Sequence, residues 1–240
     1  MNNKLLSISQ TAAQLGVSID TLRRWDLSHR LPSTRSGIRG HRYYKESDID
    51  LFTQNTRFLV SQWVKSSTGF EPDQGFYCQT RDVFQARLEK LESVLGRSLP
   101  ASSVSLLTAV AGEIGNNSFD HNLGNWLDIP GIFYACDQNL RNIFLADRGQ
   151  GILATLRRVK PELQNVSEAL RVAFTQTLSG RQPETRGNGL KFVRSVIVDQ
   201  PFTLAFQTGD AQLDLKQNGV HVVIQQADPW IRGCFAIIGY

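Results

Sequence analysis

The sequence predicts an α+β protein in two parts, a small basic helical unit followed by a larger body of helices and strands. The charge pattern separates the parts, because residues 1–60 hold nine Lys/Arg against five Asp/Glu, whereas the rest of the chain holds seventeen of each. Helical patterns fill the basic end, and helical and strand patterns alternate in the body. Between them, SSTGFEPDQG has the Gly, Ser and Pro content of a connector. We therefore expect one domain at 1–55, a linker at 56–80 and a second domain at 81–240.

The composition is that of a globular protein in a reducing compartment. Of the 240 residues, 41% are hydrophobic, which is enough to bury a core. Cys78, Cys136 and Cys234 are far apart and form no CxxC pair, so the sequence indicates neither a disulfide framework nor a zinc site. No charged-then-apolar leader opens the chain, and no apolar run reaches the ~20 residues that span a bilayer. We expect a soluble, cytoplasmic protein with no membrane partner.

Residues 7–26, SISQTAAQLGVSIDTLRRWD, predict two short helices that are separated at Gly16 and Val17. Ser9 and Ser18 stand where N-caps are expected, because a serine hydroxyl accepts from the free backbone N–H groups of a first helical turn. This spacing is typical of a helix-turn-helix, and it leaves Arg23 and Arg24 on the outer face of the second helix.

The next segment, RSGIRGHRYY, predicts a basic hairpin beside that second helix. Gly37 and Gly40 permit a tight turn, and a third helix should follow over residues 46–55. From Arg23 to Lys45 the chain holds seven Lys/Arg and one acid, a pattern that neutralises the phosphates of duplex DNA. We call this hairpin the wing, and the side chains that we expect to line it are Arg35, Arg39, His41 and Arg42.

The stretches QTAAQLGVSIDTLRRW and GHRYYKESDIDLF resemble the winged helix-turn-helix of the MerR and excisionase families. The resemblance implies that Arg23 and Arg24 approach the major groove, and that Arg39 and Arg42 contact the backbone or minor groove. It also implies a homodimer. The alternatives are that these arginines are only solvated surface, or that the unit binds protein. A stripe of Phe84, Leu88, Leu91 and Leu95 fits either a dimer seam or the first helix of the next domain.

The stretch LLTAVAGEIGNNSFDH predicts a helix that carries candidate chemistry on one face. Glu113, Asn117 and His121 are spaced by four and therefore stack beside an apolar stripe that packs on the core. A carboxylate polarises water, and an amide oxygen is a hard ligand that suits Mg²⁺ bound together with phosphates. Taken alone, the same pattern also fits a solvated helix face.

Two strands follow, over residues 129–137 and 142–147, and the second ends in Asp147-Arg-Gly149-Gln-Gly151. A carboxylate at a strand end followed by alternating glycines predicts a pocket that the backbone approaches closely. A plain strand-to-helix junction is the alternative interpretation.

The long segment from 153 to 186 should be mostly helical, with its clearest helix at 168–178. It ends in SGRQPETRGNGL, where Gly187 and Gly189 precede a helix at 190–198, and free N–H groups at such a start favour phosphate. We expect three final strands, PFTLAFQT, VHVVIQQ and CFAIIGY.

These three motifs, in this order, resemble the N, G1 and G2 boxes of the GHKL ATPases, which share the Bergerat fold. The resemblance covers about residues 80–240, and its compact length is most similar to the anti-sigma-factor serine kinases. It implies a two-layer α/β sandwich in which helices cover a mixed sheet, with ATP and Mg²⁺ as cofactors.

By the same resemblance, Glu113 orients or activates the nucleophile, Asn117 binds Mg²⁺ and Asp147 accepts from the adenine amino group. Gly149 and Gly151 would line the base and the lid hinge. His121 would touch the phosphates or position Glu113, unless it only makes a local hydrogen bond. Asn116 and Asp120 flank the helix face that carries Glu113, Asn117 and His121, and they would support those side chains from behind. The residues expected around the phosphates are Arg186, Gly187, Gly189, Leu190 and Lys191.

Departures from the family narrow the expected function. No histidine lies between Thr56 and Pro100, which disfavours histidine kinase activity, and no transducer domain precedes the end of the chain at Tyr240, so fast autonomous hydrolysis is not expected. The sequence therefore predicts a DNA-binding transcriptional regulator with an ATP–Mg²⁺ switch. The alternative is a protein serine/threonine kinase acting on a small partner protein encoded nearby.

Overall fold

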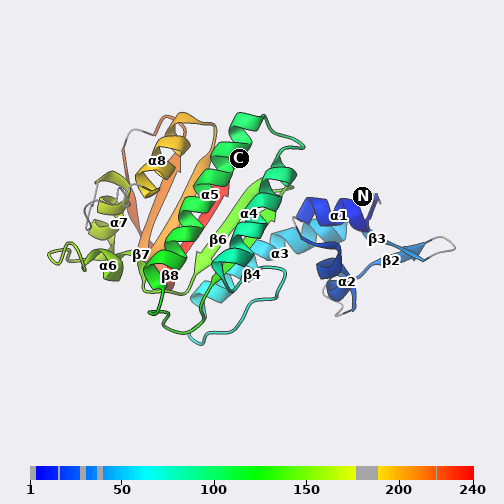
Figure 1. Ribbon diagram of the computed structural model, residues 1–240, viewed down its shortest axis with the longest axis horizontal. Coiled ribbons are helices and arrows are strands. Elements are labelled where there is room, and N and C mark those ends of the chain that lie inside the picture. Colours follow the sequence, from blue (N-terminus) through cyan, green and yellow to red (C-terminus); the bar gives the residue numbers. More distant parts are fainter. Residues whose placement is uncertain (1–3, 16, 28–30, 37–39, 177–188, 220) are drawn as a thin grey trace.

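The computed structural model describes residues 4–15, 17–27, 31–36, 40–176, 189–219 and 221–240, without the side chains of residues 53–55 (Figure 1). In this part of the chain an N-terminal head is followed by a larger body, and the α+β class is confirmed. The head consists of β1 (Leu5–Ser7), α1 (Ile8–Leu15), α2 (Ile19–Leu27), β2 (Thr34–Ser36), β3 (His41–Lys45) and the start of α3 (Glu46–Lys65). The body consists of β4 (Tyr77–Cys78), α4 (Arg81–Leu95), α5 (Ala101–Asn122), β5 (Ile132–Asp137), β6 (Asn142–Asp147), α6 (Gly151–Leu156), α7 (Val166–Thr175), α8 (Gly189–Asp199), β7 (Thr203–Lys216) and β8 (Ile224–Gly239).

The head is a pair of short helices beside a small antiparallel sheet of order β1-β3-β2. Ser18 caps α2, because its Oγ accepts from the backbone N of Thr21 at 3.0 Å, as the sequence predicts. The predicted cap at Ser9 is wrong. Instead, Ser7 Oγ accepts from the N of Gln10 at 3.3 Å, and Gln10 Oε1 accepts from the N of Ser7 at 2.9 Å, which forms a capping box two residues earlier.

The body is built on a five-stranded sheet of order β4-β5-β6-β8-β7, and every neighbouring pair is antiparallel. The expected mixed sheet is therefore wrong. Strand direction follows from the connections: a four-residue turn joins β5 to β6, and β7 returns directly as β8. Of the last two expected strands, CFAIIGY lies in β8 up to Gly239, whereas VHVVIQQ contributes only its last three residues, from Ile224, to the same strand. β6 has the predicted bounds, whereas β5 begins at Ile132 because Pro130 has no N–H and Gly131 turns the chain with φ of 90°.

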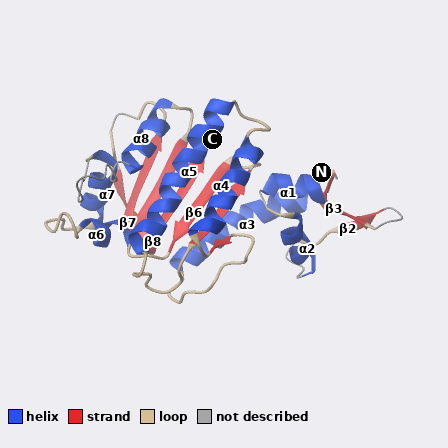
Figure 2. Cartoon of the chain, in the orientation of Figure 1, coloured by secondary structure: helices blue, strands red, loops and turns tan. Residues whose placement is uncertain are grey.

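Both faces of this sheet are covered. The helices of the body lie on one face, and α3 with the head adds a third layer on the other face, which the sequence does not predict. Helices α4, α5 and α8 cover one face (Figures 1 and 2), where Ile132 and Tyr134 of β5 join their core. The alternate residues Phe133 and Ala135 point to the other face and pack with the head and α3.

Helix α3 runs on to Lys65, ten residues past its predicted end, so the first part of the expected linker is helical. Val60, Trp63 and Val64 are at most 1% exposed, because they pack against the second face of the sheet. Beyond α3, the ring of Phe76 lies 5.3 Å from that of Trp25 in the head and 5.0 Å from that of Phe133 in the sheet. The head is thus joined to the body by a shared apolar core.

The α4 stripe packs inside the body. Phe84, Leu88, Leu91 and Leu95 are all buried in the core shared with α5, so they form the first large helix of the body, and they are not available as a dimer seam. No helix in the described part of the chain has the length and apolar composition that crossing a bilayer requires.

Close packing of α5 on α4 yields a first prediction. A Cβ on Gly115 would overlap the ring of Phe84, whereas a Cβ on Gly112 would make an ordinary contact at 3.5 Å with Leu88 Cδ1. We expect Gly115→Ala to lower the free energy of unfolding by about 1–3 kcal/mol through overpacking. Gly112→Ala, the matched control, should be neutral or stabilising, because alanine favours helix more than glycine. Urea unfolding of both variants measures the difference, and equal stabilities would contradict this packing.

Candidate functional site

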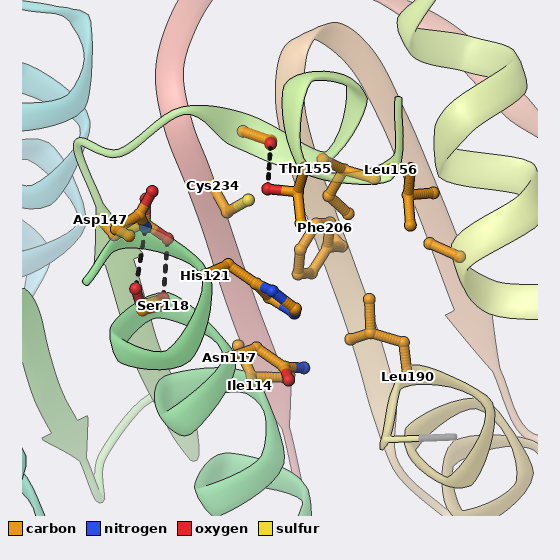
Figure 3. A pocket seen from close by; sticks show the side chains of 14 residues that line it. Ile114, Asn117, Ser118, His121, Asp147, Thr155, Leu156, Leu190, Phe206 and Cys234 are labelled. Atoms are coloured by element: carbon orange, nitrogen blue, oxygen red, sulfur yellow. Dashed lines mark hydrogen bonds between the residues drawn. The ribbon is translucent and has the colours of Figure 1, made fainter. Parts of the chain in front are cut away.

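A pocket lies between α5, the loop after β6, helices α6 to α8 and the strands β7 and β8 (Figure 3). It encloses about 550 Å³ of space between atoms, part of which is open to solvent. Most of its wall is apolar, and its polar side chains come mainly from α5, with Asp147 from the end of β6 and Thr155 from α6. The lining residues are Ile114, Asn117, Ser118, His121, Asn122, Asp147, Gly151, Ile152, Thr155, Leu156, Ala173, Leu190, Phe206 and Cys234.

Asp147 supplies a buried carboxylate to this pocket. It is 2% exposed, and it accepts from Ser118 Oγ at 2.7 Å and from the backbone N of Gly149 at 2.8 Å. Burial raises the pKa of Asp147, although these hydrogen bonds act in the opposite direction. A carboxylate has roughly four acceptor positions, and the donors Ser118 and Gly149 leave it able to accept a further hydrogen bond.

The glycines after Asp147 are required by close contacts. A Cβ on Gly149 would overlap the side chain of Asn122, and Gly151 has a φ of 75° with Thr208 close by. Asn122 was not predicted as a site residue, yet its Oδ1 accepts from the N of Gln150 at 2.9 Å and fixes the loop to the end of α5. The available signal was an amide at the last position of α5, where it meets whatever follows the helix.

The predicted stripe on α5 lies at the pocket mouth. Asn117 and His121 face Leu190 and Phe206 across the pocket (Figure 3). Desolvation at the pocket wall lowers the pKa of His121, with a smaller opposing effect from Asp120 and a further lowering by Arg158, so the neutral imidazole is favoured.

Glu113 does not line the pocket itself. It is exposed at the rim, where its carboxylate occupies the space that a Cβ on Gly189 would need. The start of α8 therefore lies against Glu113, at the start of the Glu113–His121 stripe.

The structure brings together most of the predicted pocket residues. Asn117, His121, Asp147, Gly151 and Leu190 line the pocket. Gly149 lies behind Asp147, and Lys191 lies on α8 but not in the lining. Asn116 is also absent from the lining, and Asp120 forms an ion pair with Arg81 on the α4 side. Two predicted phosphate contacts, Arg186 and Gly187, lie outside the described residues.

Arg148 is a buried arginine that the sequence pattern did not single out, because an arginine among glycines is typical of a surface loop. Its side chain is fully buried on the α3 side of the sheet. The guanidinium donates to the carbonyl oxygens of Trp63 and Ser66, and its Nη2 lies 2.6 Å from Asp128 Oδ2. Burial alone would raise the pKa of Asp128, but hydrogen bonds from Arg148 and Ile129 and the nearby positive charges lower it.

In the head, the predicted DNA contacts divide into two groups. Arg23, Arg24 and His41 are exposed, although Arg23 pairs with Asp20 at 2.8 Å and Arg24 donates to Gln74. Exposed pairs of this kind contribute little free energy, so phosphates can displace them.

The second group of head arginines holds the wing. Arg42 Nε donates to Asp26 Oδ2 at 2.7 Å, and Arg35 lies 3.6 Å from the same atom. Both side chains tie the wing to the end of α2 at Asp26. Burial alone would raise the pKa of Asp26, but hydrogen bonds from Arg42 and Ser33 outweigh it and lower the pKa. Arg39 lies outside the described residues.

The Asp128–Arg148 pair predicts a pH-dependent contribution to stability. Because the pKa of Asp128 in the folded protein lies below 3.8, its pair with Arg148 stabilises the fold above that pH and is lost as the pH falls through the folded pKa. We expect Asp128→Asn to cost roughly 1–3 kcal/mol at pH 7, less than a fully buried pair because Asp128 is partly exposed. The difference between variant and wild type in denaturant midpoint should shrink in acid. A constant difference down to low pH would contradict this assignment.

Comparisons with known proteins identify the head. Residues 6–59 match the family model described as MerR HTH family regulatory protein. Over 57 residues, the chain is 42% identical to the type II methyltransferase M.Eco47II of Escherichia coli. The aligned segment covers 24% of this chain and 14% of that protein. Residues 6–59 are therefore a helix-turn-helix domain of the MerR type.

Proposed function

We propose that the protein is a DNA-binding transcriptional regulator whose body binds ATP with Mg²⁺ and thereby switches the state of the head. The observation that carries the nucleotide part is Asp147, a buried carboxylate with acceptor capacity left at the wall of an otherwise apolar pocket. The observation that carries the DNA part is the MerR-type head with exposed arginines on α2.

The pocket residues fit an adenine nucleotide. Ile114, Ile152 and Phe206 offer apolar faces to a flat base, and Asp147 is placed to accept from an exocyclic amine. A bound nucleotide would also bring phosphates to the mouth. There, α8 begins at Gly189, and the backbone N–H groups of a first helical turn favour phosphate.

The same residues would hold magnesium only with help from the nucleotide. Asn117 offers an amide oxygen at the pocket mouth. Within the described ranges, no three His, Cys, Asp or Glu side chains gather as a metal site. Mg²⁺ commonly keeps several waters and binds through substrate phosphates, so one protein ligand is compatible with it. When bound, the ion would neutralise phosphate charge next to Asn117.

The switch needs contacts that differ between states, since a ligand shifts an equilibrium only by its differential affinity. Ile152, Thr155 and Leu156 of α6 and Ala173 of α7 line the pocket opposite α5. We propose that nucleotide draws these helices against α5 and α8, and that the change alters dimerisation or a partner surface.

Protein phosphorylation is the second candidate, and one observation favours it. Glu113 is exposed at the rim beside Gly189, where a general base would meet the hydroxyl of a docked protein. Incubation with labelled ATP and the products of neighbouring genes tests this. Transfer that Glu113→Ala abolishes, with nucleotide binding retained, would favour the kinase, and no labelled partner would favour the switch.

Nucleotide binding should depend on Asp147. An amide in place of this carboxylate turns a donor toward groups that themselves donate, so we expect Asp147→Asn to weaken ATP–Mg²⁺ binding at least tenfold, about 1.4 kcal/mol, by titration calorimetry. The matched control is Asp137→Asn, which changes a buried aspartate at the opposite end of the β5–β6 hairpin. Wild-type protein that binds no ATP, or equal binding by both variants, would refute the nucleotide site.

DNA binding should be electrostatic and should depend on α2. We expect affinity for duplex DNA to fall steeply with salt. Arg23→Ala should reduce the slope of log K against log salt by about 0.9, because one phosphate is no longer neutralised. Arg171→Ala, which removes an exposed arginine from α7 in the body, is the control and should leave the slope unchanged. A salt-independent affinity would instead indicate that the head binds protein.

A further inference from the structure

We infer that Arg148 is the positioning residue that couples the nucleotide pocket to the DNA-binding head, through the C-terminal end of α3. The inference rests on the proposed function and names the route by which that site is regulated. It uses a residue outside the pocket lining and outside the MerR-type domain.

Arg148 caps the C-terminal end of α3. The carbonyl oxygens in the last turn of a helix have no partner within the helix. Arg148 Nη1 donates to Trp63 O and Nη2 donates to Ser66 O at 3.0 Å, and the positive charge lies where the helix dipole is negative. The guanidinium carbon is also 5.9 Å from the centre of the Trp63 ring.

The same guanidinium holds the loop that joins α5 to β5. Asp128 in this loop accepts from Nε at 3.1–3.2 Å and from Nη2 at 2.6 Å. A rigid fork of donors thus joins three segments of chain, and a lysine cannot reproduce the arrangement.

Asp147 and Arg148 are consecutive and lie on opposite sides of the sheet. Asp147 contacts Ser118 of α5 on the pocket side, whereas Arg148 contacts α3 on the other side. Because they share a peptide unit, a shift of the Asp147 backbone on ligand binding moves the base of the Arg148 side chain. The fully buried guanidinium has no solvent to replace its partners, so α3 and the Asp128 loop must follow it or give up their hydrogen bonds.

Helix α3 carries such a displacement into the head. It is one helix of twenty residues from Glu46 to Lys65, about 30 Å long. Ile49 and Phe52 are buried in the core of the head, and Val60 is buried against the sheet. A change at the last turn therefore reaches the first turn without crossing a loop.

A second route from body to head exists and provides the matched control. The segment before β4 also touches the head, since Trp25 Nε1 donates to Asp73 at 2.9 Å. Arg87 holds this segment by donating to the carbonyl oxygens of Gln74, Gly75 and Tyr77. Like Arg148, it is an arginine that holds backbone carbonyls at the boundary between head and body, but it is not adjacent to the pocket.

The experiment measures DNA affinity by fluorescence anisotropy with the full chain, with and without ATP–Mg²⁺. In the wild type we expect nucleotide to change the affinity by a factor between about 5 and 150. In Arg148→Lys and Arg148→Met this factor should fall to within twofold of one, whatever the DNA affinity of each variant is without nucleotide. In Arg87→Met it should stay at the wild-type value. A retained factor in both Arg148 variants, or an equal loss in Arg87→Met, would overturn the inference.

A second measurement needs no variant, in case an Arg148 substitution unfolds the protein. In wild-type hydrogen exchange, ATP–Mg²⁺ should change the protection of residues 60–66, and unchanged protection there despite saturated binding would overturn the inference. Wild-type protein that binds ATP and DNA independently would also overturn it while leaving both binding activities in place. Failure to bind ATP at all would instead show that the proposed nucleotide function is wrong.

Discussion

The rest of the structure depends on the burial of both faces of the central hairpin, β5 and β6. Consecutive residues of β5, Ile132 and Phe133, are 1% and 2% exposed and point to opposite sides. A strand that is apolar on both faces needs a cover on each. Helix α5 belongs to the cover on one face and α3 to that on the other, so the MerR-type head is fixed to the body by the same burial that makes the sheet stable.

This two-sided burial also explains how polar chemistry arises at one end of the sheet. At the end of β6, Asp147 and Arg148 replace the apolar alternation, one on each side. Each is tolerated because its polar atoms are hydrogen-bonded, the carboxylate by Ser118 and Gly149 and the guanidinium by α3 and Asp128. One junction between strand and loop therefore serves the pocket and the contact with the head.

Local sequence patterns predict most helices and strands, whereas features that depend on contacts between distant residues are not predicted. The spacing of Asn117 and His121 predicts a shared helix face, and the strand ending in Asp147 predicts a carboxylate at a pocket. That the two meet in one pocket is what the GHKL resemblance implies, and all three side chains line the pocket. The sheet was expected to be mixed, since sequence periodicity does not encode strand direction. The sequence predicts an end of α3 ten residues before the observed one. The reason is that Val60, Trp63 and Val64 form a buried helix face only when the sheet is present to cover them. Arg148 was missed because its partners are distant in sequence, at positions 63, 66 and 128.

The continuity of α3 has a consequence for how such a protein can change during evolution. The MerR-type match ends at residue 59, inside a helix that runs to Lys65, so the junction between the two modules has a fixed helical phase. Inserting or deleting one residue there would rotate the head by about 100° around the helix axis and turn Trp63 away from the sheet. Recombination at this junction is therefore restricted to changes that preserve the phase, whereas a flexible tether would accept any length.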